Sequence, residues 1–272
     1  MTILVTGATG TVGRQIVTQL VAAGHAVRAL TRNPARADLP AGVEVAAGDL
    51  TDLASLDGVF DGVDAVHLIT FGGDDGAELT TGPGIVERCR RAGVARITVL
   101  AGWDRSPLED ALDEQGVGWT RLAPKEFMAN ALEWAPGIRA EGVVRCMATW
   151  PSAVVHEADV AAVAVVALTE DGHAGREYVL TGPEALTPAD RTALIGAACG
   201  RDLAFVALTE DQERERLRSY GYPEEYVEFG VQLAANPPAG AGEVLPTVAE
   251  VTGRPARTFS DWAVEHAAAF RG

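Results

Sequence analysis

Three glycines near the amino end of the chain have the spacing of a loop that binds a diphosphate. Gly7, Gly10 and Gly13 follow an apolar run at residues 2–6 and lead into a run at 11–23 whose apolar residues recur at helical spacing. In such a loop the first glycine permits a tight turn, and the second lets the backbone approach the diphosphate. The third lets the helix pack closely on the sheet. The start of the helix adds N–H groups and a partial positive charge.

This pattern predicts a dinucleotide site; the alternative is a glycine turn kept only for structure. The end of the second apolar run, at residues 25–31, indicates which dinucleotide. NAD sites usually carry an acid there, whereas this chain has Arg32, which can pair with a 2′-phosphate. Arg36 can assist, and the alternative for Arg32 is an ordinary surface arginine. We therefore expect NADP(H), held by Gly7, Thr9, Gly10, Thr11, Val12, Gly13, Thr31, Arg32, Asp49, Leu50, Thr70, Phe71, Ala101 and Lys125.

The elements that must position these residues alternate along the first half of the chain. Strands are predicted at residues 2–6, 25–31, 43–47, 63–69, 95–101 and 117–122, with helices at 11–23 and 84–92. Such alternation implies right-handed crossovers and a parallel sheet, and the nearly continuous apolar character of the strands implies helices on both faces.

The second half is predicted to be mostly helical. Helices are expected at 158–168, 188–199, 209–220, 224–234, 244–252 and 260–270, with one strand at 177–180. The sequence thus predicts a Rossmann-like α/β fold with a doubly wound parallel sheet. We expect an NAD(P)-binding domain over residues 1–150 and a smaller, mainly helical substrate-binding region over 151–272, from which strands can return to the main sheet.

Composition narrows the classes of partner. The 272 residues carry a net charge of −16, which argues against nonspecific binding to nucleic acid or to anionic membranes. The chain starts directly with a strand pattern, has no apolar run near 20 residues and has three widely spaced cysteines, so we expect a cytoplasmic protein with reduced thiols. We expect no metal site, and a monomer or homodimer.

Several motifs together resemble one family. They are the Gly7–Gly13 loop, Thr-Arg-Asn-Pro at 31–34, Gly-Asp-Leu at 48–50 and the segments 120–130, 155–161, 178–183 and 252–262. In this combination the chain resembles the NmrA-like group of atypical short-chain dehydrogenases over nearly its whole length. The resemblance implies binding of NADPH, with Phe127 and Asn130 in the segment beside the nicotinamide. It also implies one of two functions. The chain is expected to be either a reductase of quinones, imines or polyketides, or a regulator that senses the redox state.

The chain departs from most short-chain dehydrogenases in its proton donor. The usual Tyr-x-x-x-Lys pair is absent, since the first tyrosine is Tyr178 and the one lysine is Lys125. Three explanations remain open. The substrate or water can supply the proton, Lys125 can replace the missing donor, or catalysis has been lost.

Aromatic side chains are the candidates for substrate contact, with ordinary packing as the alternative for each. These candidates are Trp103, Phe127, Tyr220, Tyr222 and Tyr226. His67 and Glu109 are weaker candidates for proton transfer, each with a structural role as the alternative. We expect an NADPH-dependent reductase of a small carbonyl, quinone or polycyclic aromatic compound. The alternatives are a non-catalytic NADP(H)-sensing regulator and a cofactor-assisted isomerase or dehydratase.

Overall fold

The computed structural model describes residues 1–72, 77–102 and 104–271, which form two compact units. Unit 1 contains residues Met1–Pro124, Glu157–Leu180 and Thr247–Arg254. Unit 2 contains Lys125–His156, Thr181–Pro246 and Pro255–Gly272. The chain therefore returns to unit 1 twice after first leaving it, and no single boundary separates the units. The predicted division near residue 150 into a cofactor domain and a substrate region stays a prediction.

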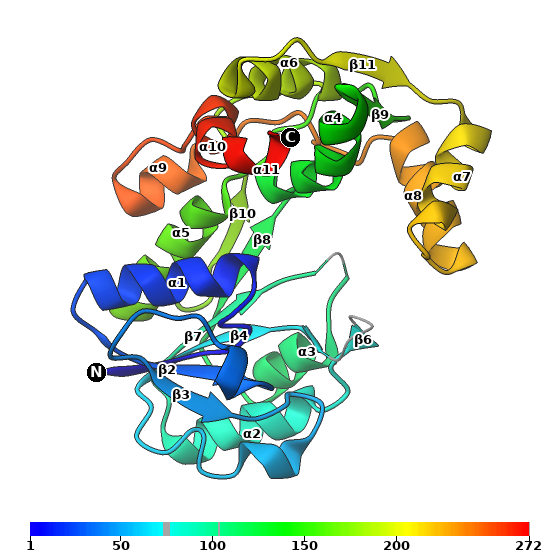
Figure 1. Cartoon of the computed structure of the whole chain (residues 1–272). Helices are drawn as coiled ribbons and strands as arrows, with labels where there is room; N and C mark the ends of the chain where they lie inside the picture. The colour runs from blue at the N-terminus through cyan, green and yellow to red at the C-terminus, as the bar shows by residue number, and fades with distance from the viewer. Residues whose placement is uncertain (73–76, 103, 272) are drawn as a thin grey trace. The chain divides into compact units, whose positions relative to one another are not determined.

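Unit 1 is built on a parallel sheet of seven strands in the order β10-β8-β7-β4-β1-β2-β3 (Figure 1). The bounds of these strands are β1 Thr2–Val5, β2 Ala26–Thr31, β3 Glu44–Ala47, β4 Ala65–Ile69, β7 Arg96–Leu100, β8 Thr120–Pro124 and β10 Glu177–Leu180. A short antiparallel pair, β5 Phe71–Gly72 and β6 Ala77–Glu78, follows β4. The strand order reverses beside β1, which is the doubly wound arrangement that the sequence predicts.

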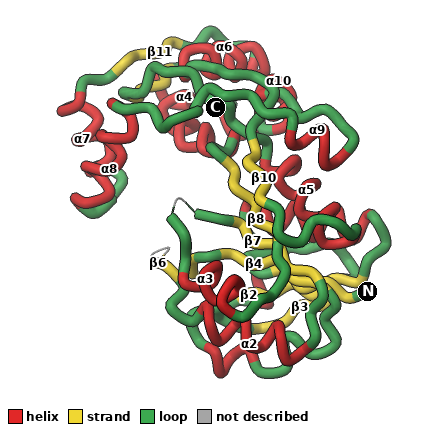
Figure 2. Tube along the Cα trace, turned by 180° about the vertical axis from the view of Figure 1, so that it is seen from behind, coloured by secondary structure: helices red, strands yellow, loops and turns green. Residues whose placement is uncertain are grey.

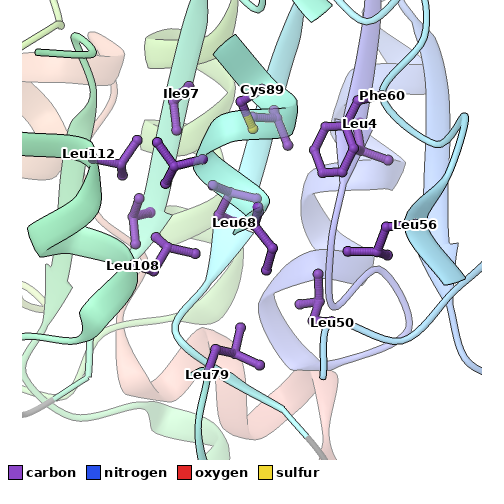
Figure 3. Packing of buried hydrophobic residues seen from close by; sticks show 14 of the residues in the cluster. Leu4, Leu50, Leu56, Phe60, Leu68, Leu79, Cys89, Ile97, Leu108 and Leu112 are labelled. Carbon is purple, nitrogen blue, oxygen red and sulfur yellow. The ribbon is translucent and has the colours of Figure 1, made fainter. Parts of the chain in front are cut away.

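Helices cover both faces of this sheet. α1 Thr11–Ala22 and α5 Glu157–Thr169 pack together on one face, while α2 Gly82–Ala92 and α3 Pro107–Glu114 pack on the other (Figure 1). α9 Thr247–Thr252 packs on α5, and short 3₁₀ helices lie at Pro34–Arg36 and Leu53–Leu56. One core of unit 1 lies under α2 and α3, where Leu4, Leu68, Ile97, Leu108 and Leu112 pack together (Figure 3).

Unit 2 is mainly helical. Its helices are α4 Ala135–Glu141, α6 Pro188–Cys199, α7 Glu210–Ser219, α8 Glu224–Ala235, α10 Phe259–Glu265 and α11 Ala267–Phe270, with a 3₁₀ helix at Met128–Trp134. Two short parallel strands, β9 Val143–Cys146 and β11 Ala204–Ala207, form a separate sheet, of which β11 is labelled in Figure 2. The core of unit 2 is aromatic and aliphatic, with Phe259, Trp262 and Phe270 packed around Ile138 and Ile195.

Most predicted elements are present. The strand predicted at 177–180 is β10 and returns to the main sheet, and the helix predicted at 260–270 is divided into α10 and α11. β9 and β11 were not expected. In the described parts of the chain no helix combines the length and apolarity needed to cross a membrane, and the strongly apolar α5 has 13 residues. All three cysteines are free thiols. The cytoplasmic location and the oligomeric state stay predictions.

Candidate cofactor and active site

The glycine loop between β1 and α1 has the close approach that its pattern predicts. Gly7 has a φ of +59°, a conformation that L side chains rarely adopt, and its carbonyl oxygen accepts a hydrogen bond from Gly10 N at 2.9 Å. A Cβ on Gly13 would lie 2.1 Å from that same oxygen. The backbone of α1 therefore packs against the loop at a distance that only glycine permits.

The loop presents backbone rather than side chains at the start of α1. Gly10 is the N-cap residue, so no side chain caps the helix, and Thr9, Gly10 and Thr11 are exposed while Val12 and Gly13 are buried. A helix of 12 residues with an uncapped, exposed start offers N–H groups and a partial positive charge to a diphosphate. The observed cradle fits the pyrophosphate of a dinucleotide.

Arg14 is a residue of this region that sequence analysis missed. Its Nη1 donates to the carbonyl oxygen of Asp38 at 2.6 Å and its Nη2 to that of Thr9 at 3.4 Å. It therefore joins the glycine loop to the segment that follows β2. The signal available in the sequence was a basic residue directly after the third glycine.

Arg32 and Asp49 lie near each other beyond the carboxyl ends of β2 and β3. Asp49 accepts hydrogen bonds from Thr51 N at 2.9 Å and Thr51 Oγ1 at 2.8 Å. These bonds, with a smaller contribution from the charge of Arg32, lower the pKa of the Asp49 carboxyl. Asp49 is thus held as an anion beside an exposed arginine, and the adjacent Leu50 is buried.

The remaining predicted cofactor residues of unit 1 follow β4 and β7. Thr70 is buried, Phe71 is 42% exposed, and Ala101 N donates to the Leu122 carbonyl oxygen at 2.9 Å. A Cβ on Gly102 would lie 3.7 Å from Thr70 Oγ1, so the two strand ends are close. The candidate Trp103 lies outside the described residues. Unit 1 therefore gathers its candidates at the carboxyl edge of one sheet, where open α/β folds bind ligands.

His67 lies inside unit 1 and is fully buried. Its Nδ1 is 2.8 Å from Thr98 Oγ1, and its Nε2 is buried with no hydrogen-bond partner in the described structure. Burial lowers the pKa of His67 to about 3, so the imidazole is neutral near pH 7. This environment supports the structural alternative for His67 over proton transfer.

Three residues expected near the nicotinamide or the substrate, Lys125, Phe127 and Asn130, belong to unit 2. Lys125 is exposed and directly follows β8, Phe127 is half-buried and pairs through its backbone with Val155, and Asn130 is exposed. They lie within six residues of one another, so one short segment presents an ammonium group, an aromatic ring and an amide.

The predicted aromatic contacts of unit 2 form an exposed cluster on α7, α8 and their connection. The rings of Tyr222 and Tyr226 are nearly parallel, with centroids 6.2 Å apart, and Tyr220 meets Tyr222 edge-on at 6.3 Å. The charge of Glu133 raises the pKa of Tyr222, and Arg216 lies 5.3 Å from the Tyr220 ring centroid. The cluster is an exposed aromatic surface. Among the described residues no group of His, Cys, Asp and Glu is arranged to hold a metal ion.

Comparisons with known proteins agree with this site. A family model described as NAD(P)H-binding matches residues 7–106, which span the glycine loop and the ends of β2, β3, β4 and β7. A (4-alkanoyl-5-oxo-2,5-dihydrofuran-3-yl)methyl phosphate reductase from Streptomyces griseus is 43% identical, over 98% of this chain and 99% of its own length. An NAD(P)H azoreductase from Xenophilus azovorans is 36% identical, over 98% and 99%.

A solved structure extends the likeness to a cofactor complex. The NADPH-dependent quinone oxidoreductase QOR2 of Escherichia coli, complexed with NADPH, superposes with a TM-score of 0.80 and 25% identity, over 97% of this chain and 99% of that one. These relatives confirm the predicted cofactor class, NAD(P)H, and the predicted enzyme class, an oxidoreductase. The chain belongs to the NAD(P)H-binding, NmrA-like family of atypical short-chain dehydrogenases, as its motifs predict.

Proposed function

We propose that this chain is an NADPH-dependent reductase of small molecules in which a carbonyl, quinone or conjugated double bond accepts a hydride. The observation that carries the proposal is the cradle at Gly7–Gly13, open at the start of α1 and followed by Arg32 rather than an acid at the end of β2. A 2′-phosphate pairs with a guanidinium, whereas the 2′-hydroxyl of NADH prefers a carboxylate. We therefore expect NADPH to bind more tightly than NADH.

When bound, NADPH supplies a hydride, so the chain's own residues must orient the partners and manage one proton. The Tyr-x-x-x-Lys pair that supplies the proton in most short-chain dehydrogenases is missing from this sequence. A substrate that spreads the developing negative charge over two oxygens needs less help from an acid than an isolated ketone does. The relative from Streptomyces griseus is named for a substrate of that kind, with a ring carbonyl and an alkanoyl group on one unsaturated ring. Quinones share this property.

Lys125 is the residue that we propose to meet the developing oxyanion. It is exposed, it is the one lysine of the chain, and the segment that it begins also presents Phe127. An ammonium group stabilises a negative oxygen electrostatically and can pass a proton to it. We propose that Phe127 and the tyrosine cluster contact the flat part of the substrate, and that Trp103 does the same.

The test is oxidation of NADPH by the purified protein, with NADH in parallel. The panel contains a naphthoquinone, a 2-acylbutenolide and, as the contrasting substrate, cyclohexanone. We expect turnover with the first two, a preference for NADPH of about tenfold, and no measurable turnover with cyclohexanone.

Two outcomes would contradict parts of the proposal. Tight NADPH binding without turnover on any conjugated substrate would favour a cofactor-sensing regulator, because catalysis would then be missing while the site is intact. Equal turnover of cyclohexanone would refute the argument from charge delocalisation. The variant Lys125→Met tests the proposed role of the lysine by itself. We expect its kcat to fall by about tenfold while its affinity for NADPH changes less.

A further inference from the structure

Glu126, the residue after the proposed oxyanion-binding lysine, is held by two side chains of unit 2. Its Oε1 accepts a hydrogen bond from Arg191 Nη1 at 2.8 Å, and its Oε2 accepts one from the hydroxyl of Ser152. Ser152 is 2% exposed and Arg191 is 5% exposed. Both oxygens of the Glu126 carboxylate are therefore engaged, although Lys125 is its neighbour in the chain.

Burial of the Arg191 guanidinium costs desolvation free energy. Its guanidinium lies 5.3 Å from the ring centroid of Trp134, and its Nε is buried without a hydrogen-bond partner in the part of the chain that the structure describes. A buried ion pair seldom stabilises a fold more than apolar packing of the same volume would. A gain in stability alone therefore does not account for the buried Glu126–Arg191 pair.

The backbone of the same segment is fixed as well. Val155 N donates to the Glu126 carbonyl oxygen at 2.8 Å, and Met128 N donates to the Val155 carbonyl oxygen at 2.9 Å. Residues 126–128 are thus held through both backbone and side chain, and the exposed Lys125 extends from the end of this fixed segment.

We propose that Glu126, Arg191 and Ser152 are positioning residues for Lys125. Their network fixes the segment that carries the lysine and keeps the Glu126 carboxylate from pairing with the ammonium group. Lys125 then keeps its charge available for an anionic oxygen of the substrate. This inference rests on the proposed function, in which Lys125 meets that oxygen.

Because the chain has a single lysine, one NMR signal reports the environment of the Lys125 side chain. Protein labelled with ¹³Cε-lysine gives one lysine signal, without any chemical modification of the chain. We would record that signal, with and without NADP⁺, for the parent protein, Arg191→Met, Ser152→Ala and Glu126→Gln, and measure kcat and KM for each. Arg145→Met is the matched control, because Arg145 belongs to unit 2 but pairs with Glu141 on the surface.

We expect Arg191→Met to shift or broaden the lysine signal and to lower kcat by about tenfold, with KM for NADPH within about twofold. Ser152→Ala should give a smaller change in the same direction, and Arg145→Met none. Arg191→Lys, tested by kinetics alone, should recover part of kcat because it restores a cation beside Glu126. An unchanged lysine signal and unchanged kcat in both Arg191→Met and Ser152→Ala would overturn the proposal.

The design also separates this inference from the function on which it rests. If Arg191→Met does not fold, Ser152→Ala and Arg191→Lys decide, since both keep most of the buried contacts. If Lys125→Met retains full turnover, the proposed function of Lys125 fails, whatever its signal does. If Lys125→Met is inactive but Arg191→Met and Ser152→Ala leave the signal and kcat unchanged, the positioning role alone fails.

Discussion

Arg121 on β8 donates a hydrogen bond from Nε to Oε1 of Glu109 on α3 at 2.8 Å, and the Glu109 side chain is fully buried. The other carboxylate oxygen of Glu109 accepts hydrogen bonds from the backbone N and the hydroxyl of Ser106, which completes a capping box at the start of α3. Both oxygens are thus engaged by groups within unit 1. This arrangement supports a structural role for Glu109, which the sequence offered as a weak candidate for a general acid.

The Glu109–Arg121 pair predicts a large loss of stability when the negative charge of Glu109 is removed. Glu109→Gln should lower the free energy of unfolding by about 3 kcal/mol, because Arg121 would lose its buried counter-ion and one amide oxygen cannot accept from both Arg121 and Ser106. Urea unfolding followed by circular dichroism measures the change. Glu87→Gln is the control, since Glu87 pairs with Arg90 and Arg91 on the surface and its replacement should matter little. Equal losses in the two variants would contradict the prediction.

The Glu109–Arg121 pair also shows where sequence analysis stops. The glycine loop and the strands that surround it were predictable because their signals are local, either three glycines at fixed spacing or an apolar run. The arginine partners of Glu109 and Glu126 lie 12 and 65 residues away, and no local pattern connects them. β9 and β11 were missed for the same reason, since each has four residues and its partner strand is remote in the chain.

The third glycine of the loop gives a sharp steric prediction. Gly13→Ala places a Cβ 2.1 Å from Gly7 O, so α1 must move, and we expect a loss of about 3 kcal/mol or more and of NADPH binding. Gly10→Ala adds the same methyl group in the same loop, but its nearest atom is 3.2 Å away and its φ is −80°. Thermal unfolding should therefore show a much smaller change for Gly10→Ala. Similar melting temperatures for the two variants would refute the close approach.

Burial of His67 predicts a dependence of stability on pH. The pKa of His67 is about 3 in the folded chain, against about 6.5 when the chain is unfolded. Between these values only the unfolded state binds the proton, so stability is full above pH 6.5 and falls as the pH drops. The slope should reach about 1.4 kcal/mol per pH unit.

Urea unfolding between pH 4.5 and 7.5, compared with the variant His67→Gln, isolates this contribution. The variant lacks the titrating ring, so the stability difference between the two proteins should change with pH below 6.5. Parallel curves across the whole range would show that His67 takes up its proton equally in both states.

Arg32 predicts the cofactor preference. Arg32→Ala should weaken NADPH binding by about tenfold and leave NADH binding within about twofold, because only NADPH carries the 2′-phosphate. Titration calorimetry with both nucleotides measures the ratio. Arg90→Ala, which removes an exposed arginine from α2, serves as the control for a simple loss of charge. An unchanged ratio of the two affinities in Arg32→Ala would remove Arg32 from the 2′-phosphate site.

The exposed tyrosines of unit 2 predict a dependence on substrate size. Tyr226 is 58% exposed, and its ring lies nearly parallel to that of Tyr222. If this surface receives a flat substrate, Tyr226→Ala should raise KM about fivefold for a polycyclic quinone, because aromatic stacking contributes about 1 kcal/mol. A single-ring benzoquinone covers less of the surface and should show a smaller change. Val264→Ala removes a comparably exposed side chain from α10 and should alter neither KM. The same KM ratio for both quinones in Tyr226→Ala would show that the cluster does not bind the extended ring system.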